Sequence, residues 1–240
     1  MVVKSQIKLI KNLQQKKYRT QNSLFVAEGI KTVSELLKSE IENYQVYSTD
    51  DSLFGEDEIS VQLITEKELG QMSNLKTPNK VIGVFHIPKP KQIDFSNWVV
   101  ALDDVSDPGN LGTIIRLCDW FGIRHLLCSR NTVDCYNPKV LQATMGSIAR
   151  VNVLYDNLVQ VCISSKTSIY GTFMNAKTVY EQKLPDSGVL VMGNEANGIS
   201  KELELLCTER ICIPHFGEST TESLNVATAT AIFLNEIRRG

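Results

Sequence analysis

Short apolar runs alternate with stretches of helical apolar spacing along residues 98–240. Such runs predict buried strands, and apolar residues three or four positions apart predict amphipathic helices. The predicted strands are 98–103, 125–129, 151–155, 168–173, 189–194 and 210–214, and the predicted helices are 110–122, 138–146, 158–165, 200–207 and 223–239. Buried strands that alternate with helices are typical of a mostly parallel sheet with helices on both faces. We therefore predict an α/β fold for this part of the chain.

The first part of the chain also mixes helices and strands. Helical spacing predicts one helix over residues 5–16 and another over 30–37. Thr65 and Glu68 have the spacing of a capping box, which predicts the start of a further short helix. The predicted strands are 23–29, 44–48, 61–64 and 81–87. This mixture indicates a small α/β domain.

A proline-containing segment separates the two patterns. Pro88 and Pro90 lie with two lysines in residues 87–97. Proline lacks a backbone donor and keeps its neighbours extended, which favours a linker. We therefore predict a first domain over residues 1–90 and a second over residues 96–240.

The composition is that of a folded globular protein. Of 240 residues, 42% are hydrophobic and 22% are charged, which is ordinary for this class. No run of about 18 apolar residues predicts a membrane span, and the N-terminal residues lack the apolar segment of a secretory signal. The six cysteines form no Cys-x-x-Cys pair, which favours reduced thiols and no metal site. We expect a cytoplasmic protein without membrane contacts.

Positive charge gathers at the N-terminus although the whole chain has a net charge of −2. Residues 1–27 contain no acidic residue, and a local basic cluster neutralises phosphates even in an acidic protein. The candidate RNA-binding residues are Lys11, Lys16, Lys17 and Arg19. A solvated helix face explains the same pattern, and both interpretations stay open.

The first of three polar segments follows the strand at 98–103. Asn110 is predicted to cap the next helix, after the turn at Pro108 and Gly109. Arg116 lies four residues after Gly112, on a face predicted to be exposed, and is expected to reach back over that glycine toward the loop. A guanidinium beside a helix N-terminus suits a phosphate or a forming oxyanion. An arginine in a surface ion pair is the alternative.

The second and third segments follow the strands at 189–194 and 210–214. Gly193 and Gly198 bracket Glu195, so the backbone can approach a ligand closely; a tight turn with a solvated glutamate is the alternative. In the third segment, Ser219 and Glu222 have capping-box spacing. Ser223 and Asn225, which flank Leu224, have no such explanation and indicate a ligand pocket.

Several common enzyme classes are disfavoured by motifs that the sequence lacks. It contains no Walker loop, no Gly-x-Gly-x-x-Gly fingerprint and no Gly-x-Ser-x-Gly elbow. Nucleotide hydrolases, dinucleotide dehydrogenases and α/β-hydrolases normally carry these motifs.

Together the three segments resemble the three motifs of the SpoU (TrmH) family of RNA 2′-O-ribose methyltransferases, in the SPOUT class. The first motif corresponds to Asn110-x-Gly112-x-x-x-Arg116, the second to Gly193-Asn-Glu195 with Gly198 and Ser200, and the third to Ile213-Pro214 followed by residues 223–227. Their order and spacing agree over residues 98–240. The front half resembles the substrate-binding domain of many members.

The resemblance implies properties that composition and spacing do not show. It implies a deep trefoil knot in the C-terminal part, S-adenosylmethionine bound there, and a homodimer whose site is completed across the interface. The implied cofactor contacts are Gly193, Ile213 and Leu224, with Thr172 and Gly198. The implied catalytic set is Asn110, Arg116, Glu195, Ser223 and Asn225.

The resemblance also implies the chemistry, which is attack of a ribose 2′-oxygen on a sulfonium methyl group. The family assigns the base to the position of Arg116, but a guanidinium stays protonated. Stabilising the alkoxide or binding a phosphate suits it better. We interpret His215 as part of the loop structure.

The implied partner is structured RNA, and no DNA partner is expected. By analogy, the front domain favours 23S rRNA over tRNA as the substrate. A non-catalytic RNA-binding relative is the other alternative, although all three motifs are intact. A small-molecule methyltransferase would not need the basic segment or the front domain.

Overall fold

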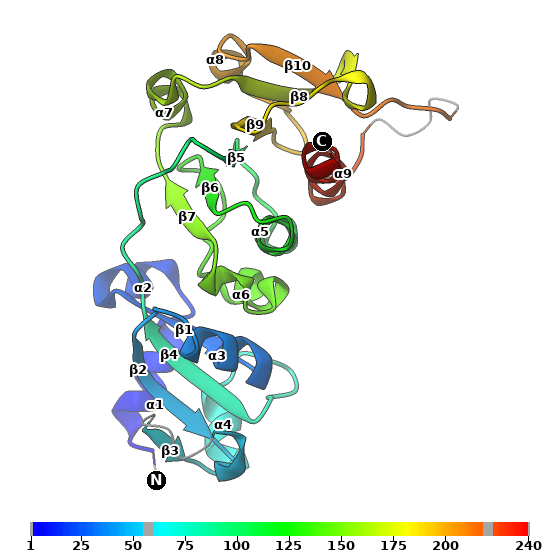
Figure 1. Ribbon diagram of the computed structural model, residues 1–240. Helices are drawn as coiled ribbons and strands as arrows, with labels where there is room; N and C mark the ends of the chain where they lie inside the picture. Colours follow the sequence, from blue (N-terminus) through cyan, green and yellow to red (C-terminus); the bar gives the residue numbers. More distant parts are fainter. Residues whose placement is uncertain (1, 55–59, 218–222, 240) are drawn as a thin grey trace. The chain divides into compact units, whose positions relative to one another are not determined.

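The computed structural model describes residues 2–54, 60–217 and 223–239. The chain forms two compact units (Figure 1), which are Met1–Lys89 with Asp134–Ala149, and Pro90–Val133 with Arg150–Gly240. We call them the N-terminal unit and the C-terminal unit. The prediction placed residues 134–149 in the second domain, but in the structure they pack with the first.

The N-terminal unit is built on a mixed four-stranded sheet. Its strand order is β1-β4-β2-β3, and the strands are β1 (Leu24–Glu28), β2 (Asn43–Ser48), β3 (Val61–Leu63) and β4 (Val81–His86). β4 pairs antiparallel with β1 and β2, whereas β2 and β3 are parallel. Its helices include α3 (Ile30–Leu37), α4 (Glu66–Met72) and the 3-10 turn η1 (Asp51–Leu53). The expected capping box begins α4, with both of its hydrogen bonds present.

The helix predicted over residues 5–16 is two helices, α1 (Lys4–Asn12) and α2 (Lys16–Asn22). Leu13 is buried at the junction, and the guanidinium of Arg19 donates to the Leu13 and Gln14 carbonyls at 2.9 and 2.8 Å. Leu13 is the C-cap of α1, where a carbonyl has no partner within the helix, and Gln14 follows it in the junction. Arg19 therefore stabilises the break between the two helices.

Residues 134–149 form α6 (Pro138–Thr144) and the turn η2 (Ser147–Ala149). α6 contacts β1, and Tyr136 packs its ring 4.6 Å from that of Phe25. Gly146 has φ +97°, and a Cβ there would lie 2.7 Å from the Glu35 Cβ, so this segment packs closely on α3. The buried side chain of Arg19 pairs with Asp134. Packing and charge both attach this segment to the N-terminal unit.

The C-terminal unit is built on a parallel six-stranded sheet, as predicted. Its order is β10-β8-β9-β5-β6-β7, and its strands are β5 (Trp98–Leu102), β6 (His125–Cys128), β7 (Asn152–Tyr155), β8 (Ile169–Thr178), β9 (Gly188–Met192) and β10 (Glu209–Cys212). All of its strand pairs are parallel. β5 and β9 lie at its centre and are buried along their whole length, which explains their continuous apolar runs.

Helices cover both faces of this sheet (Figure 1). Alternate residues Val99 and Ala101 of β5 pack with α7 (Leu158–Ser165) and α8 (Lys201–Glu204) in one cluster. α5 (Pro108–Trp120) and α9 (Val226–Arg239) contact each other on the other side of the sheet. The short turn η3 (Val179–Glu181) follows β8. α8 is shorter than its predicted range, and β8 is longer. The trefoil knot stays a prediction.

The cap expected for α5 was wrong. Asp107, not Asn110, is the N-cap, and its side chain accepts from the Asn110 backbone N–H at 2.7 Å. Pro108 occupies the first turn, where its missing N–H costs nothing. The side chain of Asn110 is therefore available for another contact. None of the helices in the described residues is long and apolar enough to span a bilayer.

Candidate active site

The loop after β9 is a closed turn that requires glycine. A Cβ on Gly193 would lie 2.3 Å from the carbonyl carbon of Gly198, which itself has φ +68°. Two backbone hydrogen bonds of 2.9 Å join Asn194 and Gly198. Backbone contact this close leaves no space for a side chain at position 193.

Carboxylate and amide groups hold this loop against the end of β5. The Asn194 amide donates to the Asp104 carbonyl, and the Ser200 N–H donates to the buried carboxylate of Asp103, both at 2.7 Å. The carboxyl ends of parallel strands lie at the same edge of a sheet, which is where ligands bind in open α/β folds. The first and second polar segments therefore meet at this edge.

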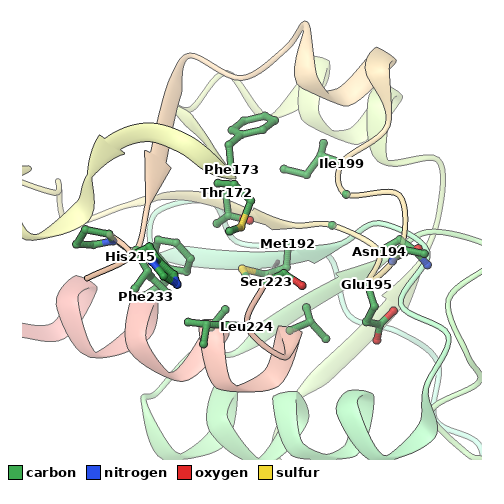
Figure 2. Close-up of a pocket in the computed structure, with 18 of the residues that line it drawn as sticks. Thr172, Phe173, Met192, Asn194, Glu195, Ile199, His215, Ser223, Leu224 and Phe233 are labelled. Atoms are coloured by element: carbon green, nitrogen blue, oxygen red, sulfur yellow. Dashed lines mark hydrogen bonds between the residues drawn. The ribbon is translucent and has the colours of Figure 1, made fainter. Parts of the chain in front are cut away.

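A cavity of about 630 Å³ opens at the same edge (Figure 2). Its lining includes all five predicted cofactor residues, which are Thr172, Gly193, Gly198, Ile213 and Leu224. Two predicted catalytic residues, Glu195 and Ser223, also line it. The cavity volume lies within the roughly 300–1,000 Å³ range of small-molecule sites.

Most of the apolar wall of this cavity consists of residues that were not predicted from the sequence. The additional lining residues include Phe173, Met192, Ile199, Phe216 and Phe233. Phe233 comes from the buried face of α9, seven positions after Val226, which also lines the cavity. The guanidinium of Arg210 lies 3.7 Å from the centre of the Phe173 ring and pairs with Glu204. The position of Phe173 at the end of a predicted strand could have indicated a cavity residue. The helical spacing of Phe233, in contrast, predicts only a core residue.

Asn110 connects the three motif segments. Its amide donates to Oε1 of Glu195 at 2.8 Å, and its Oδ1 accepts from the Asn225 amide at 2.8 Å. Oδ1 of Asn225 in turn accepts from the N–H groups of Ala227 and Thr228, so Asn225 caps α9. Segments about a hundred residues apart in sequence are thus fixed by one chain of side-chain hydrogen bonds. The expected caps Ser219 and Glu222 lie outside the described residues.

Arg116 stands apart from this network. It is exposed on α5 and makes no hydrogen bond or ion pair with any of the described residues. Gly112 is buried, so the prediction that the two share an exposed face was wrong. α5 buries the glycine because α9 packs against α5. The guanidinium remains accessible to a bound substrate.

The predicted RNA contacts divide into two kinds. Lys11, Lys16 and Lys17 are exposed on α1 and α2. Arg19 is only 3% exposed and is committed to Asp134 and to two backbone carbonyls. Its assignment to RNA was wrong, because the sequence does not show which face of α2 the interior covers.

All six cysteines are free thiols, and five of them are buried. Burial raises the pKa of the Cys118 thiol, and it raises the pKa of the Cys162 thiol to about 11. Such thiols are poor nucleophiles. They act as small apolar side chains in the core.

Comparison with known proteins identifies the family. Residues 97–235 match the sequence model of the SpoU rRNA methylase family, and residues 4–83 match that of the MRM3-like substrate binding domain. The chain belongs to the SpoU family. The three linked segments all lie within the residues that match the SpoU model.

SpoU relatives match over most of the chain. It is 32% identical to the 23S rRNA (guanosine(2553)-2′-O)-methyltransferase RlmP of Bacillus subtilis, over 95% of this chain and 94% of the relative. A protein of the TrmH family of RNA methyltransferases from Porphyromonas gingivalis has 35% identity and a TM-score of 0.90, covering 100% of both chains. An AdoMet-bound rRNA methyltransferase from Sinorhizobium meliloti has 28% identity and a TM-score of 0.87, covering 100% of this chain and 96% of that one.

Proposed function

We propose that the chain transfers a methyl group from S-adenosylmethionine to a ribose 2′-hydroxyl of 23S rRNA in the cytoplasm. The observation that carries this proposal is the hydrogen-bonded chain Glu195–Asn110–Asn225, which joins all three SpoU motifs beside the cavity. The similarity to RlmP, which extends over nearly the whole chain, supports the choice of rRNA.

The cavity suits S-adenosylmethionine in its volume and in the chemistry of its lining. Gly193 lets the loop after β9 close on Gly198 at the edge of the cavity, and Phe173 and Phe233 supply an apolar wall for an adenine ring. Thr172, Gly198, Ile213 and Leu224 complete the proposed cofactor contacts. The bound cofactor would supply an electrophilic methyl group on a positively charged sulfur.

The protein's part in the reaction is to position the ribose and to stabilise charge. The 2′-hydroxyl is a poor nucleophile, so its proton must leave as the new oxygen–carbon bond forms. Arg116 stabilises the developing negative oxygen or an adjacent phosphate, which its planar cation suits. Asn110, Glu195 and Asn225 hold the motif loops in register, and Ser223 lies at the cavity wall to contact the ribose.

We also propose that the protein acts as a homodimer. The family resemblance implies that the site of this protein is completed across a two-fold interface, and symmetric contacts of this kind are common in oligomers. Exposed Trp120, at the end of α5, is our candidate for the centre of that interface.

Mapping of ribose methylation tests the function directly. RNA from cells with and without this gene should differ at a 23S rRNA ribose, and purified protein should restore methylation with S-adenosylmethionine. A difference confined to tRNA would contradict the substrate. No difference in any RNA, together with no cofactor binding by calorimetry, would contradict the enzyme assignment. Cofactor affinity should persist with a chelator present.

A further inference from the structure

A second cavity, of about 500 Å³, lies entirely within the N-terminal unit. Three segments line it: the β1–α3 region, residues 74–77, and α6 from the segment between β6 and β7. It shares no residue with the cavity at the SpoU motifs.

The charges of this cavity favour an anion. Lys76 and Lys139 come from different segments, are exposed, and form no ion pair with any residue that the structure describes. Glu28 is the acidic residue of the lining. Its carboxylate already accepts from the Asn74 N–H at 2.9 Å and from the Ser73 hydroxyl. The lining therefore carries two lysines without an ion pair among the described residues and one carboxylate that already holds the loop.

Thr32 adds a polar group to the cavity lining. The residue is only 6% exposed, and it forms no hydrogen bond with any described residue. Its hydroxyl is not one of the described side-chain atoms that are fully buried without a partner. A molecule bound in the cavity could therefore reach this hydroxyl and form a hydrogen bond with it.

The remaining lining sets the kind of ligand. Val26, Leu75, Pro138 and Leu141 form an apolar surface next to the amides of Asn74 and Gln142. An anionic group beside a flat ring with polar edges fits both surfaces. A cavity of this size admits a single splayed nucleotide but not a double helix, and proteins read RNA mainly through such unstacked bases.

We propose that this cavity binds one unstacked nucleotide of the substrate RNA. Lys76 and Lys139 contact its phosphates, the apolar surface holds its base, and Thr32 forms a hydrogen bond to its sugar or base. The identity of the ligand as RNA rests on the proposed function. In the sequence, α6 follows β6 and precedes β7. Part of this site therefore comes from within the residues that match the SpoU model.

Binding of RNA by matched variants of the full-length protein tests the proposal. Lys76→Glu and Lys139→Glu should each weaken binding of a labelled single-stranded RNA hexamer by about fivefold or more at low salt, because each removes a cation that binds phosphate. Lys67→Glu makes the same charge change on α4, outside the cavity, and should change the affinity by less than about twofold. Equal effects of Lys67→Glu and Lys139→Glu would overturn the proposal.

Thr32→Val separates a ligand contact from a structural role. It keeps the shape of the side chain and removes a hydroxyl that has no partner among the described residues. The melting temperature should stay the same or rise, while RNA affinity falls. A lower melting temperature with unchanged RNA affinity would show that the hydroxyl serves the fold and would overturn this part of the proposal.

Two further measurements distinguish the sources of failure. Displacement of the hexamer by micromolar concentrations of the four 5′-ribonucleoside monophosphates would identify a free-nucleotide site and overturn the RNA assignment. Methyl transfer by wild-type protein, with every cavity variant binding RNA normally, would overturn this inference and leave the proposed function intact. Loss of RNA binding in the variants, with no methyl transfer by wild-type protein, would uphold the cavity and contradict the proposed function.

Discussion

At the residue scale, the N-cap of α5 decides which hydrogen bonds the Asn110 side chain can form. Asp107 takes the N-cap of α5 and accepts from the Asn110 backbone. Asn110 therefore uses both ends of its amide elsewhere, as a donor to Glu195 and an acceptor from Asn225. An aspartate at this position keeps the size of the side chain but removes the donor and adds a charge beside Glu195.

We expect Asn110→Asp to slow methyl transfer by roughly a hundredfold, a scale measured when one preorganised hydrogen-bond donor is removed. The two adjacent carboxylates would repel and separate the first two motif loops. Cofactor affinity by calorimetry should change less than the single-turnover rate. Asn235→Asp, on the exposed part of α9, is the matched control. A wild-type rate for Asn110→Asp would remove this hydrogen-bonded chain from the mechanism.

Arg116 presents the opposite case, an exposed cation without a described partner. Arg116→Ala should reduce the single-turnover rate by about a hundredfold or more if the guanidinium stabilises transition-state charge. Cofactor affinity should barely change, and exposed Arg124→Ala serves as control. Arg116→Lys keeps the charge without the planar fork, so it should restore part of the rate. A shift of whole pH units in the lysine variant's rate profile would instead indicate a base.

At the element scale, the start of α4 depends on a charged capping box. Glu68 accepts from the Thr65 and Val2 N–H groups, each at 2.8 Å. The Thr65 backbone hydrogen bond is the largest cause, with Val2 next, and together they lower the pKa of Glu68 to about 2 from its ordinary 4.5. The ionised form is thus favoured in the folded state. Its contribution is complete above pH 4.5 and disappears as the pH falls toward about 2.

Replacing Glu68 with glutamine should therefore lower the melting temperature at neutral pH. The difference in melting temperature between the variant and the wild type should become smaller as the pH falls from 4.5 toward about 2, because the Glu68 carboxylate of the wild type becomes protonated. Thermal unfolding followed by circular dichroism between pH 2 and 7 measures this. Glu66→Gln, in the same helix turn without these hydrogen bonds, is the control. A constant difference across the range would contradict the charged cap.

At the scale of the whole molecule, the proposed homodimer can be tested at Trp120. Its side chain is 83% exposed at the end of α5, next to Phe121, whose carbonyl accepts from Arg238 of α9 at 2.7 Å. Large exposed aromatic residues are enriched at interfaces. Trp120→Glu should convert the dimer to a monomer in light scattering, whereas Leu205→Glu, at a site 86% exposed beyond α8, should not. A dimer that survives Trp120→Glu would place the interface elsewhere.

The basic N-terminal segment belongs to the same scale, because salt dependence reports all phosphate contacts together. Replacing Lys11, Lys16 and Lys17 with glutamine should reduce the slope of log affinity against log salt by about 0.7 to 0.9 for each phosphate that the protein no longer neutralises. Arg19→Gln provides the contrast. This variant should have a less stable fold and an unchanged slope, since Arg19 is buried against Asp134. An unchanged slope in the triple variant would identify a solvated face.

Much of the fold could be predicted from local patterns in the sequence. The alternation of apolar runs and helices determined the parallel sheet, because buried strands must be apolar on both faces. Three motifs at strand ends indicated the cavity, since parallel strands bring their carboxyl ends to one edge. The capping box at Thr65 could also be predicted, because its two partners are only three residues apart in sequence.

Only the tertiary structure decided which partners distant residues have. Arg19 had the same local appearance as the neighbouring lysines, yet contact with Asp134 makes it part of the interior. The sequence predicted a helix cap at Asn110, but the structure places its side chain against Asn225 of the third motif. Helical spacing predicted only a core residue at Phe233, but the structure places it in the cavity wall together with residues of β8. Residues 134–149 joined the N-terminal unit through Tyr136 and Gly146. Local sequence determines periodicity and caps, whereas burial and hydrogen bonding depend on surfaces that meet only after the chain folds.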